Sequence, residues 1–223
     1  MNHLNIASTI DHTLLSPEAT AADIDKLCDE ARQHHFFSVC IPPCWVPHAK
    51  KRLAGSEAKV VTVISFPHGN DLSSSKAVAA KNAQQAGADE IDMVMNLGLA
   101  KAGDWTAVEK DISEVVQAVR GIPVKVILET CLLSQDQIEK ACQAATKAGA
   151  KFVKTSTGYS KSGATVEAVR LMCASVPASL EVKASGGIRD AETAQKMLEA
   201  GATRLGTSSG VAIVSGKTSA SSY

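Results

Sequence analysis

The three residues Ala-Gly-Ala close three separate segments of helical pattern, at 86–88, 148–150 and 200–202, and each time a short apolar run follows. A glycine just past the end of a helix commonly takes the left-handed conformation that stops the helix. The runs that follow are too short for helices and have the composition of buried strands. A chain that passes from helix to strand in the same way three times is predicted to be an α/β protein built from one repeated unit.

Eight such strands are expected, alternating with helical patterns. They cover 8–15, 38–41, 59–66, 89–96, 124–129, a run that starts at 151, 180–184 and 203–206. Eight units in 223 residues fit a single (β/α)8 barrel, or TIM barrel, better than an open doubly wound sheet of about five or six strands. We predict one barrel domain over 1–223 with a mobile polar tail at 217–223, although the length also permits two small domains.

Local patterns predict where several helices begin. Ser134 and Gln137 have the spacing of a capping box, in which each side chain accepts the backbone N–H of the other residue. Asp190 is expected to cap the helix after the seventh strand. Ser16 is expected to cap the first helix, with Pro17 at its first position.

The composition excludes several classes of function. Lysine and arginine number 23 and so do aspartate and glutamate, a balance that is not typical of proteins that bind nucleic acid or charged membranes. No apolar run of about eighteen residues and no signal sequence is present, which favours a cytoplasmic protein that does not span a membrane. The six cysteines form no Cys-x-x-Cys pair and the six histidines lack metal-site spacing, so we expect no disulfide, metal or cofactor.

Charged residues stand in the middle of four successive expected strands: Asp92, Lys125, Lys154 and Lys183. In a barrel such a residue is tolerated on the face that looks into the lumen. Any one of the four could be a structural ion-pair partner. A single lysine such as Lys154 could also extend its alkyl chain along the strand end and place its amine in solvent. Four at similar depth indicate a functional cluster, because buried charges rarely stabilise a protein more than apolar residues would.

Three ammonium groups beside one carboxylate predict at least one lysine with a lowered pKa. A neutral amine can attack a carbonyl carbon and form an imine, while Asp92 and a second lysine move protons. We interpret this as Schiff-base aldol chemistry, with Lys154 as the expected nucleophile. The charges alone do not rank Lys154 above Lys183.

The loops after the last two expected strands, 185–188 and 206–210, are rich in glycine and hydroxyl side chains. TIM barrels commonly bind phosphate at these positions through backbone N–H groups. One Gly-Ser turn is usually only a turn, but two at matching strand ends predict a phosphate site. Gly158, in the loop after the sixth strand, is expected to join the pocket, so a small phosphorylated molecule is the expected substrate.

Six motifs together resemble the deoxyribose-phosphate aldolase family over essentially the whole chain. They are Ile-Asp-His-Thr-Leu-Leu (10–15), Glu-Ile-Asp-Met-Val-Met-Asn (90–96), Val-Lys-Val-Ile-Leu-Glu-Thr (124–130), Phe-Val-Lys-Thr-Ser-Thr-Gly (152–158), Val-Lys-Ala-Ser-Gly-Gly-Ile-Arg (182–189) and Leu-Gly-Thr-Ser-Ser-Gly (205–210). The resemblance implies a metal-free class I aldolase, a lyase of deoxyribose phosphate catabolism and carbohydrate degradation. It would reversibly cleave 2-deoxy-D-ribose 5-phosphate to D-glyceraldehyde 3-phosphate and acetaldehyde.

The resemblance also implies roles for single residues. Lys154 would form the Schiff base, Lys183 would perturb it and move protons, and Asp92 would be the general acid and base acting through water. The pocket and phosphate residues would be Thr13, Lys125, Gly158, Gly187, Gly206, Ser208 and Ser209.

Three further positions follow from the resemblance. Cys40 matches a cysteine linked in the family to inactivation by aldehydes. Tyr223 matches a C-terminal tyrosine that dips into the site to assist proton transfer. Tyr159 stands where some members have a lysine, which puts a phosphate contact from that position in doubt.

Two alternatives remain. Another Schiff-base barrel, such as a transaldolase or a sugar-bisphosphate aldolase, would differ in not using acetaldehyde as donor. A catalytically silent barrel would bind a phosphorylated metabolite and regulate a partner, without needing Lys154, Lys183 and Asp92 together. Family members are often dimers or larger, so a homo-oligomer is compatible with the resemblance.

Overall fold

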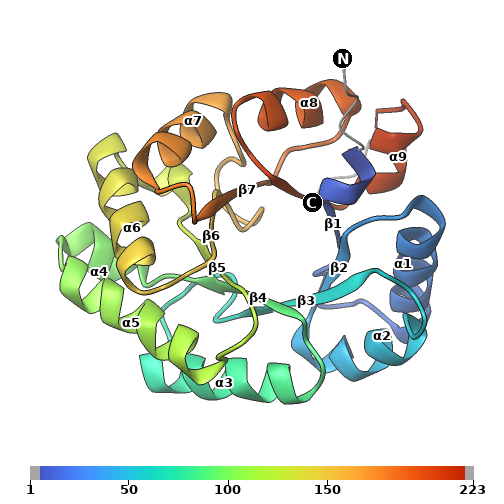
Figure 1. Ribbon diagram of the computed structural model, residues 1–223, viewed down its shortest axis with the longest axis horizontal. Helices are drawn as coiled ribbons and strands as arrows, with labels where there is room; N and C mark the ends of the chain where they lie inside the picture. Colours follow the sequence, from blue (N-terminus) through green and yellow to red (C-terminus); the bar gives the residue numbers. More distant parts are fainter. Residues whose placement is uncertain (1–5, 219–223) are drawn as a thin grey trace.

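The structure, a computed structural model, describes residues 6–218. Within them, eight parallel strands form a closed barrel in which each strand pairs with the next and β8 pairs with β1 (Figure 1). The strands are β1 (Ile10–Thr13), β2 (Ser38–Ile41), β3 (Lys59–Ile64), β4 (Glu90–Val94), β5 (Val124–Ile127), β6 (Phe152–Lys154), β7 (Glu181–Ser185) and β8 (Arg204–Thr207). The predicted (β/α)8 fold is confirmed.

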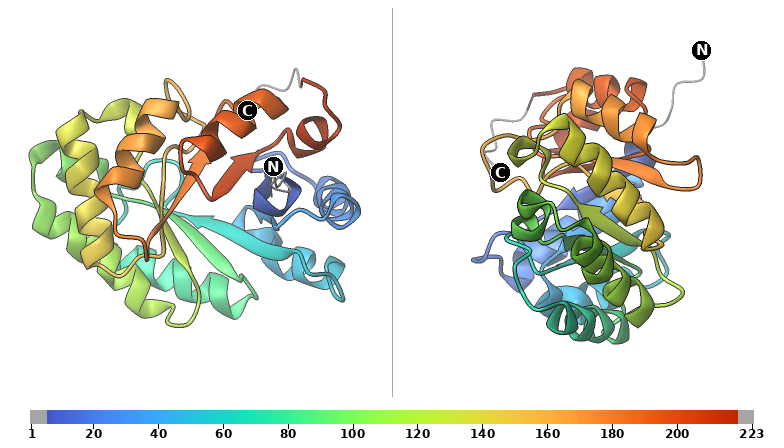
Figure 2. Two further views of the ribbon diagram at one scale, coloured as in Figure 1. Left: turned by 45° about the horizontal axis from the view of Figure 1, so that its top comes forward. Right: turned by 90° about the vertical axis from the view of Figure 1, so that its left-hand side faces the viewer.

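Helices surround the strands on the outside, as two further views show (Figure 2). The α-helices are α1 (Ala21–His34), α2 (Val46–Arg52), α3 (Ser73–Gln85), α4 (Leu97–Ala102), α5 (Trp105–Ala118), α6 (Gln135–Lys147), α7 (Val166–Ser175), α8 (Ala191–Glu199) and α9 (Gly210–Val214). Short 3-10 helices are η1 (Ile6–Thr9), η2 (Pro43–Trp45) and η3 (Thr130–Leu132). None of the helices in the described part of the chain has the length and apolar character needed to cross a membrane.

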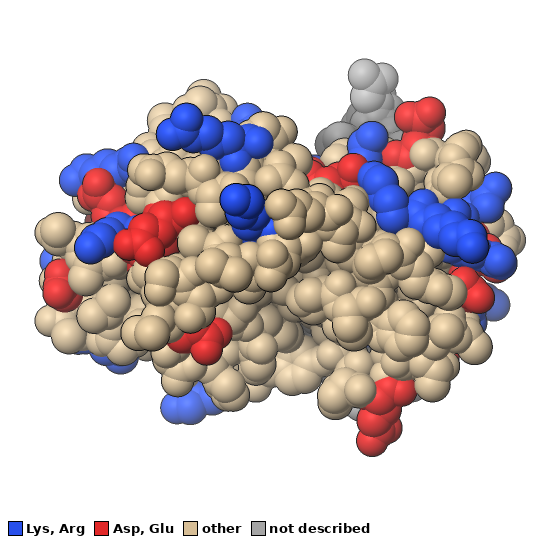
Figure 3. All heavy atoms as spheres, turned by 90° about the horizontal axis from the view of Figure 1, so that it is seen from below, with Lys and Arg blue, Asp and Glu red and all other residues tan. Residues whose placement is uncertain are grey.

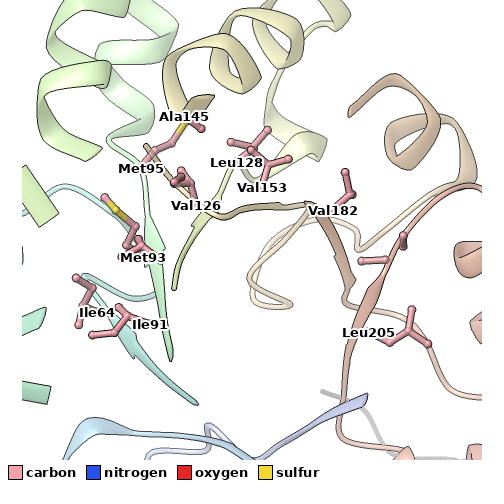
Figure 4. Packing of buried hydrophobic residues seen from close by; sticks show 14 of the residues in the cluster. Ile64, Ile91, Met93, Met95, Val126, Leu128, Ala145, Val153, Val182 and Leu205 are labelled. Atoms are coloured by element: carbon pink, nitrogen blue, oxygen red, sulfur yellow. The ribbon is translucent and has the colours of Figure 1, made fainter. Parts of the chain in front are cut away.

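Side chains alternate between the two faces of each strand. On β4, Ile91 and Met93 pack in the hydrophobic core between strands and helices, whereas Glu90 and Asp92 make ion pairs inside the lumen. Figure 4 shows this outer layer through ten labelled side chains: Ile64, Ile91, Met93, Met95, Val126, Leu128, Ala145, Val153, Val182 and Leu205. Each fully buried apolar side chain contributes about 1.5–3 kcal/mol. This layer stabilises the closed barrel, so the lumen can hold polar groups.

The glycines of the three Ala-Gly-Ala triplets have the expected left-handed conformation, with φ of 108° at Gly87, 82° at Gly149 and 111° at Gly201. The capping box of Ser134 and Gln137 is present at the start of α6, and the side chain of Asp190 caps α8. Glycine endings and capping residues thus set several helix boundaries as the sequence predicted.

The first helix begins later than predicted. Its N-cap is Thr20, whose hydroxyl accepts the N–H of Asp23, while the Asp23 carboxylate accepts the N–H of Thr20 at 2.9 Å. Ser16 instead closes a turn in which its carbonyl oxygen accepts the N–H of Ala19 at 3.2 Å. The prediction of Ser16 as the cap was wrong because the reciprocal box at Thr20 satisfies two backbone donors at once.

The carboxyl ends of all eight described strands open on one rim of the barrel, where TIM-barrel enzymes hold their active sites. The predicted mobile tail at 217–223 is described only as far as residue 218, and Tyr223 lies outside the described residues. The strand ends and the loops that follow them are therefore the place for an active site.

Candidate active site

Lys154, the last residue of β6, stands in register with Lys183 of β7. The Oδ2 atom of Asp92 on β4 lies 2.8 Å from the Nζ of Lys154 and 2.8 Å from the Nζ of Lys183. All three side chains are almost completely buried. A single carboxylate oxygen therefore holds two amines together inside the lumen.

Lys125 of β5 extends this contact towards the amino ends of the strands. Its Nζ atom lies 2.8 Å from the Oδ1 of Asp92 and 2.6 Å from the Oε2 of Glu90. On the other side of the lumen, the Oδ2 of Asp11 on β1 lies 2.5 Å from the Nζ of Lys183. Both oxygens of Asp92 are thus engaged with lysines.

Arg204 of β8 joins the two outer carboxylates. Its Nη1 lies 3.0 Å from the Oδ1 of Asp11 and 2.9 Å from the Oε2 of Glu90, and its guanidinium stacks 3.5 Å from the centre of the Phe37 ring. We call the resulting group the lumen cluster; it consists of Asp11, Glu90, Asp92, Lys125, Lys154, Lys183 and Arg204.

The lumen cluster holds four basic groups and three acidic ones. With every group ionised, it would carry one excess positive charge in a buried space, which is costly. Lys154 contacts one carboxylate of the cluster, whereas Lys183 contacts two. Loss of the proton from Lys154 therefore makes the net charge of the cluster zero and breaks one ion pair, whereas loss of the proton from Lys183 would break two.

The pKa shifts agree with this balance. Burial lowers the pKa of Lys154, and the nearby Lys183 ammonium lowers it further against the opposing effect of Asp92. Burial also disfavours the charged form of Lys183, but the carboxylates of Asp11 and Asp92 outweigh burial and raise its pKa. The structure thus distinguishes the two lysines that the sequence could not rank: Lys154 is the potential nucleophile and Lys183 is the persistent cation.

The two aspartates of the cluster remain ionised. Burial opposes ionisation of Asp92, yet Lys125, Lys154 and Lys183 together hold its pKa well below the usual range. Lysines and Arg204 do the same for the pKa of Asp11. Asp92 is therefore a carboxylate at rest and accepts hydrogen bonds from the amines around it.

An apolar group lies on the β1–β3 side of the lumen. It consists of Leu15, Cys40, Val61 and Val63, with Phe66 packed against it. Burial raises the pKa of Cys40 to about 11, and the charges of Lys183 and Lys154 also act on this thiol. A small apolar wall thus stands beside the charged groups of the lumen, near enough for Lys154 to act on the Cys40 thiol.

The loops after β7 and β8 line one shared hollow at the rim. Its lining residues are Gly186, Gly187, Ile188, Arg189, Gly206, Thr207, Ser208 and Ser209. Gly187 has a φ of 77° and faces open space, and the N–H of Ser209 donates to the Oγ1 of Thr207 at 2.9 Å. Backbone N–H groups and serine hydroxyls at such a rim are suited to a phosphate group.

Comparison with known proteins supplies the family. A model of the DeoC/LacD family of aldolases matches residues 6–216. The chain belongs to the DeoC/LacD aldolase family. The deoxyribose-phosphate aldolase of Mannheimia succiniciproducens is 55% identical over 216 residues, which cover 97% of this chain and 96% of the relative. That of Brevibacillus brevis is 54% identical and covers 99% of this chain and 100% of the relative.

Solved structures give the same result. A putative deoxyribose-phosphate aldolase from Coccidioides immitis superposes with a TM-score of 0.92 at 45% identity, over 95% of this chain and 85% of that one. The deoxyribose phosphate aldolase from Aeropyrum pernix, described as a unique tetrameric structure, gives 0.89 at 35% identity, over 94% and 89%. The chain is an aldolase by family, and its fold is that of its relatives.

The remaining predicted pocket residues of this DeoC/LacD aldolase also gather at the rim. Gly158 has a φ of 89°, and its Cα lies 3.5 Å from where a Cβ on Gly186 would stand, so the loops after β6 and β7 touch. Thr13 is buried, donates to the carbonyl oxygen of Asp11 at 2.9 Å and lines a second hollow together with Ser208. The structure thus brings the predicted phosphate and pocket residues to one end of the barrel, except Lys125, which is fully buried deeper in the lumen.

Sequence reasoning missed part of the site. It expected three ammonium groups beside one carboxylate, whereas the lumen holds three carboxylates, because Asp11 and Glu90 contribute as well. Arg204 was missed too. The rule that charged residues in strands face the lumen also applies to Asp11, which stands in the middle of the motif Ile-Asp-His-Thr, and to Arg204 at the start of β8.

A further unpredicted residue of the aldolase shapes the loop after β6. The buried carboxylate of Glu129 accepts the N–H of Thr157 at 3.3 Å and also its hydroxyl. The N–H of Tyr159 in turn donates to the Oγ1 of Thr157 at 3.0 Å, and the Tyr159 ring lies edge-on to Phe66, with centroids 5.4 Å apart. Glu129 therefore fixes the loop that follows Lys154.

Proposed function

We propose that the protein is a deoxyribose-phosphate aldolase that reversibly cleaves 2-deoxy-D-ribose 5-phosphate to D-glyceraldehyde 3-phosphate and acetaldehyde. The observation that carries the proposal is the buried amine of Lys154, with its pKa lowered and its Nζ 2.8 Å from a carboxylate that also holds Lys183. The relatives from Mannheimia succiniciproducens and Brevibacillus brevis, more than half identical over almost their full length, bear the same name.

In the first step, the neutral amine of Lys154 attacks the C1 aldehyde of the open-chain sugar. Proton transfers then convert the carbinolamine to an imine with loss of one water molecule. Lys183 and Asp92 are suited to take part in these transfers because the Oδ2 atom of Asp92 contacts the amines of both Lys154 and Lys183. Lys183 remains charged beside the reacting amine and donates a hydrogen bond there, while protons pass between the Lys183–Asp92 pair and the intermediate through water.

In the second step, the C3 hydroxyl loses its proton and the bond between C2 and C3 breaks. The bonding electrons move into the protonated imine and give an enamine, while C3 leaves as the aldehyde of D-glyceraldehyde 3-phosphate. Protonation of the enamine at C2 and hydrolysis of the new imine release acetaldehyde and restore Lys154. The methyl end of this short donor would lie against the apolar group around Cys40 and Val61.

The phosphate would be held by Gly187, Gly206, Ser208 and Ser209, with Gly158 beside them. Tyr159, which stands where some family members have a lysine, supplies no positive charge for the phosphate. Arg189, on the exposed edge of the same hollow, is a cation that could meet its charge. Lys125 would act through Asp92, and Tyr223 keeps its predicted role in proton transfer.

The cellular setting is also a proposal. An aldolase of this substrate belongs in deoxyribose phosphate catabolism, and the free state of all six cysteines suits the cytoplasm. We further propose that residues 1–223 form one domain, since the closed barrel uses strands from both ends of the described chain.

The proposal is tested by mixing the protein with 2-deoxy-D-ribose 5-phosphate and measuring both products. Equal amounts of glyceraldehyde 3-phosphate and acetaldehyde are expected. Cleavage of a ketose phosphate alone would indicate a transaldolase or sugar-bisphosphate aldolase instead. Binding of the sugar phosphate without cleavage would indicate the catalytically silent barrel.

We also propose that the protein forms a homo-oligomer through the outer face of α3. Leu72 and Val78 are 76% and 59% exposed there, which is unusual for large apolar side chains. They stand near an apolar groove between α3 and η2, lined by residues that include Pro43, Ala79 and Ala86. Seen from the side of α3, the middle of this face carries few charged side chains (Figure 3).

Charges placed on this face are expected to disrupt the assembly. The double variant Leu72→Glu, Val78→Glu should lower the molar mass measured by sedimentation towards that of one chain, because like charges would meet across a desolvated contact. The control is Lys140→Glu on α6, where the lysine is exposed and pairs only with Asp136 among the described residues. An unchanged mass in the double variant would place the interface elsewhere.

A further inference from the structure

His12 lies on β1 but faces away from the lumen. Its Nε2 atom is 2.8 Å from the Oε2 of Glu30 on α1, and its ring centroid is 4.9 Å from that of Phe36. The backbone of His12 is in register with Thr207 on β8, directly before the Ser208–Gly210 turn. Figure 1 shows α9 beside β1 and α1, and the contacts of His12 with Glu30 on α1 and with Gly210, the first residue of α9, place its ring between β1 and these two helices.

The His12 ring touches the end of that turn. A Cβ on Gly210 would lie 2.9 Å from the Nδ1 of His12 and 3.0 Å from the Cζ of Phe36, closer than side chains allow. Gly210 therefore has no free space on this side, and the imidazole limits how far the Ser208–Gly210 turn can move away from the lumen.

Glu30 and Phe36 hold the imidazole of His12 in place. A hydrogen bond from His12 lowers the pKa of Glu30 against the effect of partial burial, so this carboxylate is ionised at neutral pH. The ring is fixed by a charge-assisted hydrogen bond at Nε2 and by packing on Phe36 at its face. Its position is thus determined independently of the turn that it touches.

Packing alone does not account for a histidine here. Its Nδ1 atom is buried and, within residues 6–218, has no hydrogen-bond partner. An unpartnered buried polar atom costs free energy, and an apolar ring would fill the same space without that cost. The feature that an apolar ring lacks is the bond to Glu30, which fixes the ring in one orientation.

We propose that His12 is a positioning residue for the phosphate group of the substrate. Glu30 fixes the imidazole, the imidazole sets the position of the Ser208–Gly210 turn, and the turn presents the N–H of Ser208 and the hydroxyls of Ser208 and Ser209 to phosphate. This inference rests on the proposed function, because it assigns a support to the phosphate site proposed there. His12 takes no part in imine chemistry, since it lies outside the lumen.

The test compares 2-deoxy-D-ribose 5-phosphate with unphosphorylated 2-deoxy-D-ribose. In His12→Ala the KM for the phosphorylated sugar is expected to rise about tenfold with little change in kcat, because a turn displaced by a fraction of an ångström weakens binding of its ligand. The value of kcat/KM for the unphosphorylated sugar is expected to stay the same. Glu30→Gln should show the same selective loss to a smaller degree.

Two more variants make the test independent of folding problems at His12. Gly210→Ala pushes on the same contact from the other side and is expected to cause the same phosphate-selective rise in KM. His48 also pairs with a carboxylate of α1, Asp25, at 2.9 Å, but lies on α2 away from the turn. His48→Ala is the matched control and should leave both sugars unaffected.

The outcomes separate this inference from the proposed function. If the wild-type protein prefers the phosphorylated sugar and His12→Ala loses activity equally on both sugars, the residue is only structural and the inference is wrong. Unchanged kinetics in both His12→Ala and Gly210→Ala would overturn it as well. A wild-type protein that treats the two sugars alike would overturn the proposed phosphate site together with the role of His12.

Discussion

Replacing Lys154 with alanine is expected to lower kcat for cleavage of 2-deoxy-D-ribose 5-phosphate by about 10,000-fold or more, because no imine can form without the amine. The fold should survive. The lumen cluster without Lys154 holds three basic and three acidic groups, so the substitution removes the group with the lowered pKa rather than a needed countercharge. Steady-state kinetics and a thermal unfolding curve measure the two effects.

Lys151 provides the matched control for this variant. It lies three residues before Lys154, its side chain is 49% exposed, and its Nζ lies 3.6 Å from the Oε1 of Glu181. Because such an exposed pair contributes at most about 1 kcal/mol, Lys151→Ala should keep activity within about twofold. Residual activity well above background in Lys154→Ala, with Lys151→Ala normal, would mean that another residue is the nucleophile.

Replacing Lys183 with methionine is expected to have the second large effect, on both rate and stability. Asp11 and Asp92 would lose the cation that each contacts at 2.5 and 2.8 Å, and breaking buried pairs of this kind costs about 3–5 kcal/mol. The rate should fall by about 100-fold or more, because the ammonium that helps to keep the Lys154 amine neutral is lost. Chemical denaturation and single-turnover kinetics give the two values.

The same variant should change the pH dependence of the reaction in a defined direction. The amine of Lys154 must be neutral to attack, and the Lys183 ammonium contributes to its lowered pKa after burial. Removing that ammonium raises the pKa of Lys154, so the rise of kcat/KM on the acidic side of the profile should move to higher pH. Lys183→Arg keeps the positive charge. In this variant kcat/KM should rise at about the same pH as in the wild-type protein, although the rate itself falls. If kcat/KM of Lys183→Met instead rose at a lower pH than in the wild-type protein, Lys183 could not be the group that lowers the pKa of Lys154.

The fold was predictable because its signals are local. Eight short apolar runs and the glycine endings at 87, 149 and 201 depend only on nearby residues, and the structure has strands and left-handed glycines at those places. The start of α1 was not predictable with equal certainty, because Ser16 and Thr20 both offer a capping hydroxyl. The choice depends on Asp23, which completes the reciprocal box at Thr20.

The site was predictable in part. Asp92, Lys125, Lys154 and Lys183 stand out as charged residues in otherwise apolar strands, and the structure places them together. The contact of Lys183 with Asp11 joins residues 172 positions apart, and that of Arg204 with Asp11 spans 193.

Such contacts exist because β8 closes against β1; the predicted barrel implies this closure, but it does not say which side chains meet across the lumen. The ranking of the lysines depends on the same closure. Asp11 gives Lys183 a second carboxylate, and that contact raises the pKa of Lys183 while the pKa of Lys154 remains lowered.

The central claim is that Lys154 forms the imine, and trapping that imine tests it most directly. The protein is incubated with acetaldehyde, reduced with borohydride and digested, and the peptides are analysed by mass spectrometry. A single ethyl group on Lys154 is the predicted result, with none on Lys183, whose pKa is raised. An adduct on Lys183 would keep the chemistry but reverse the two lysines, and no adduct on a folded protein would contradict the imine route altogether.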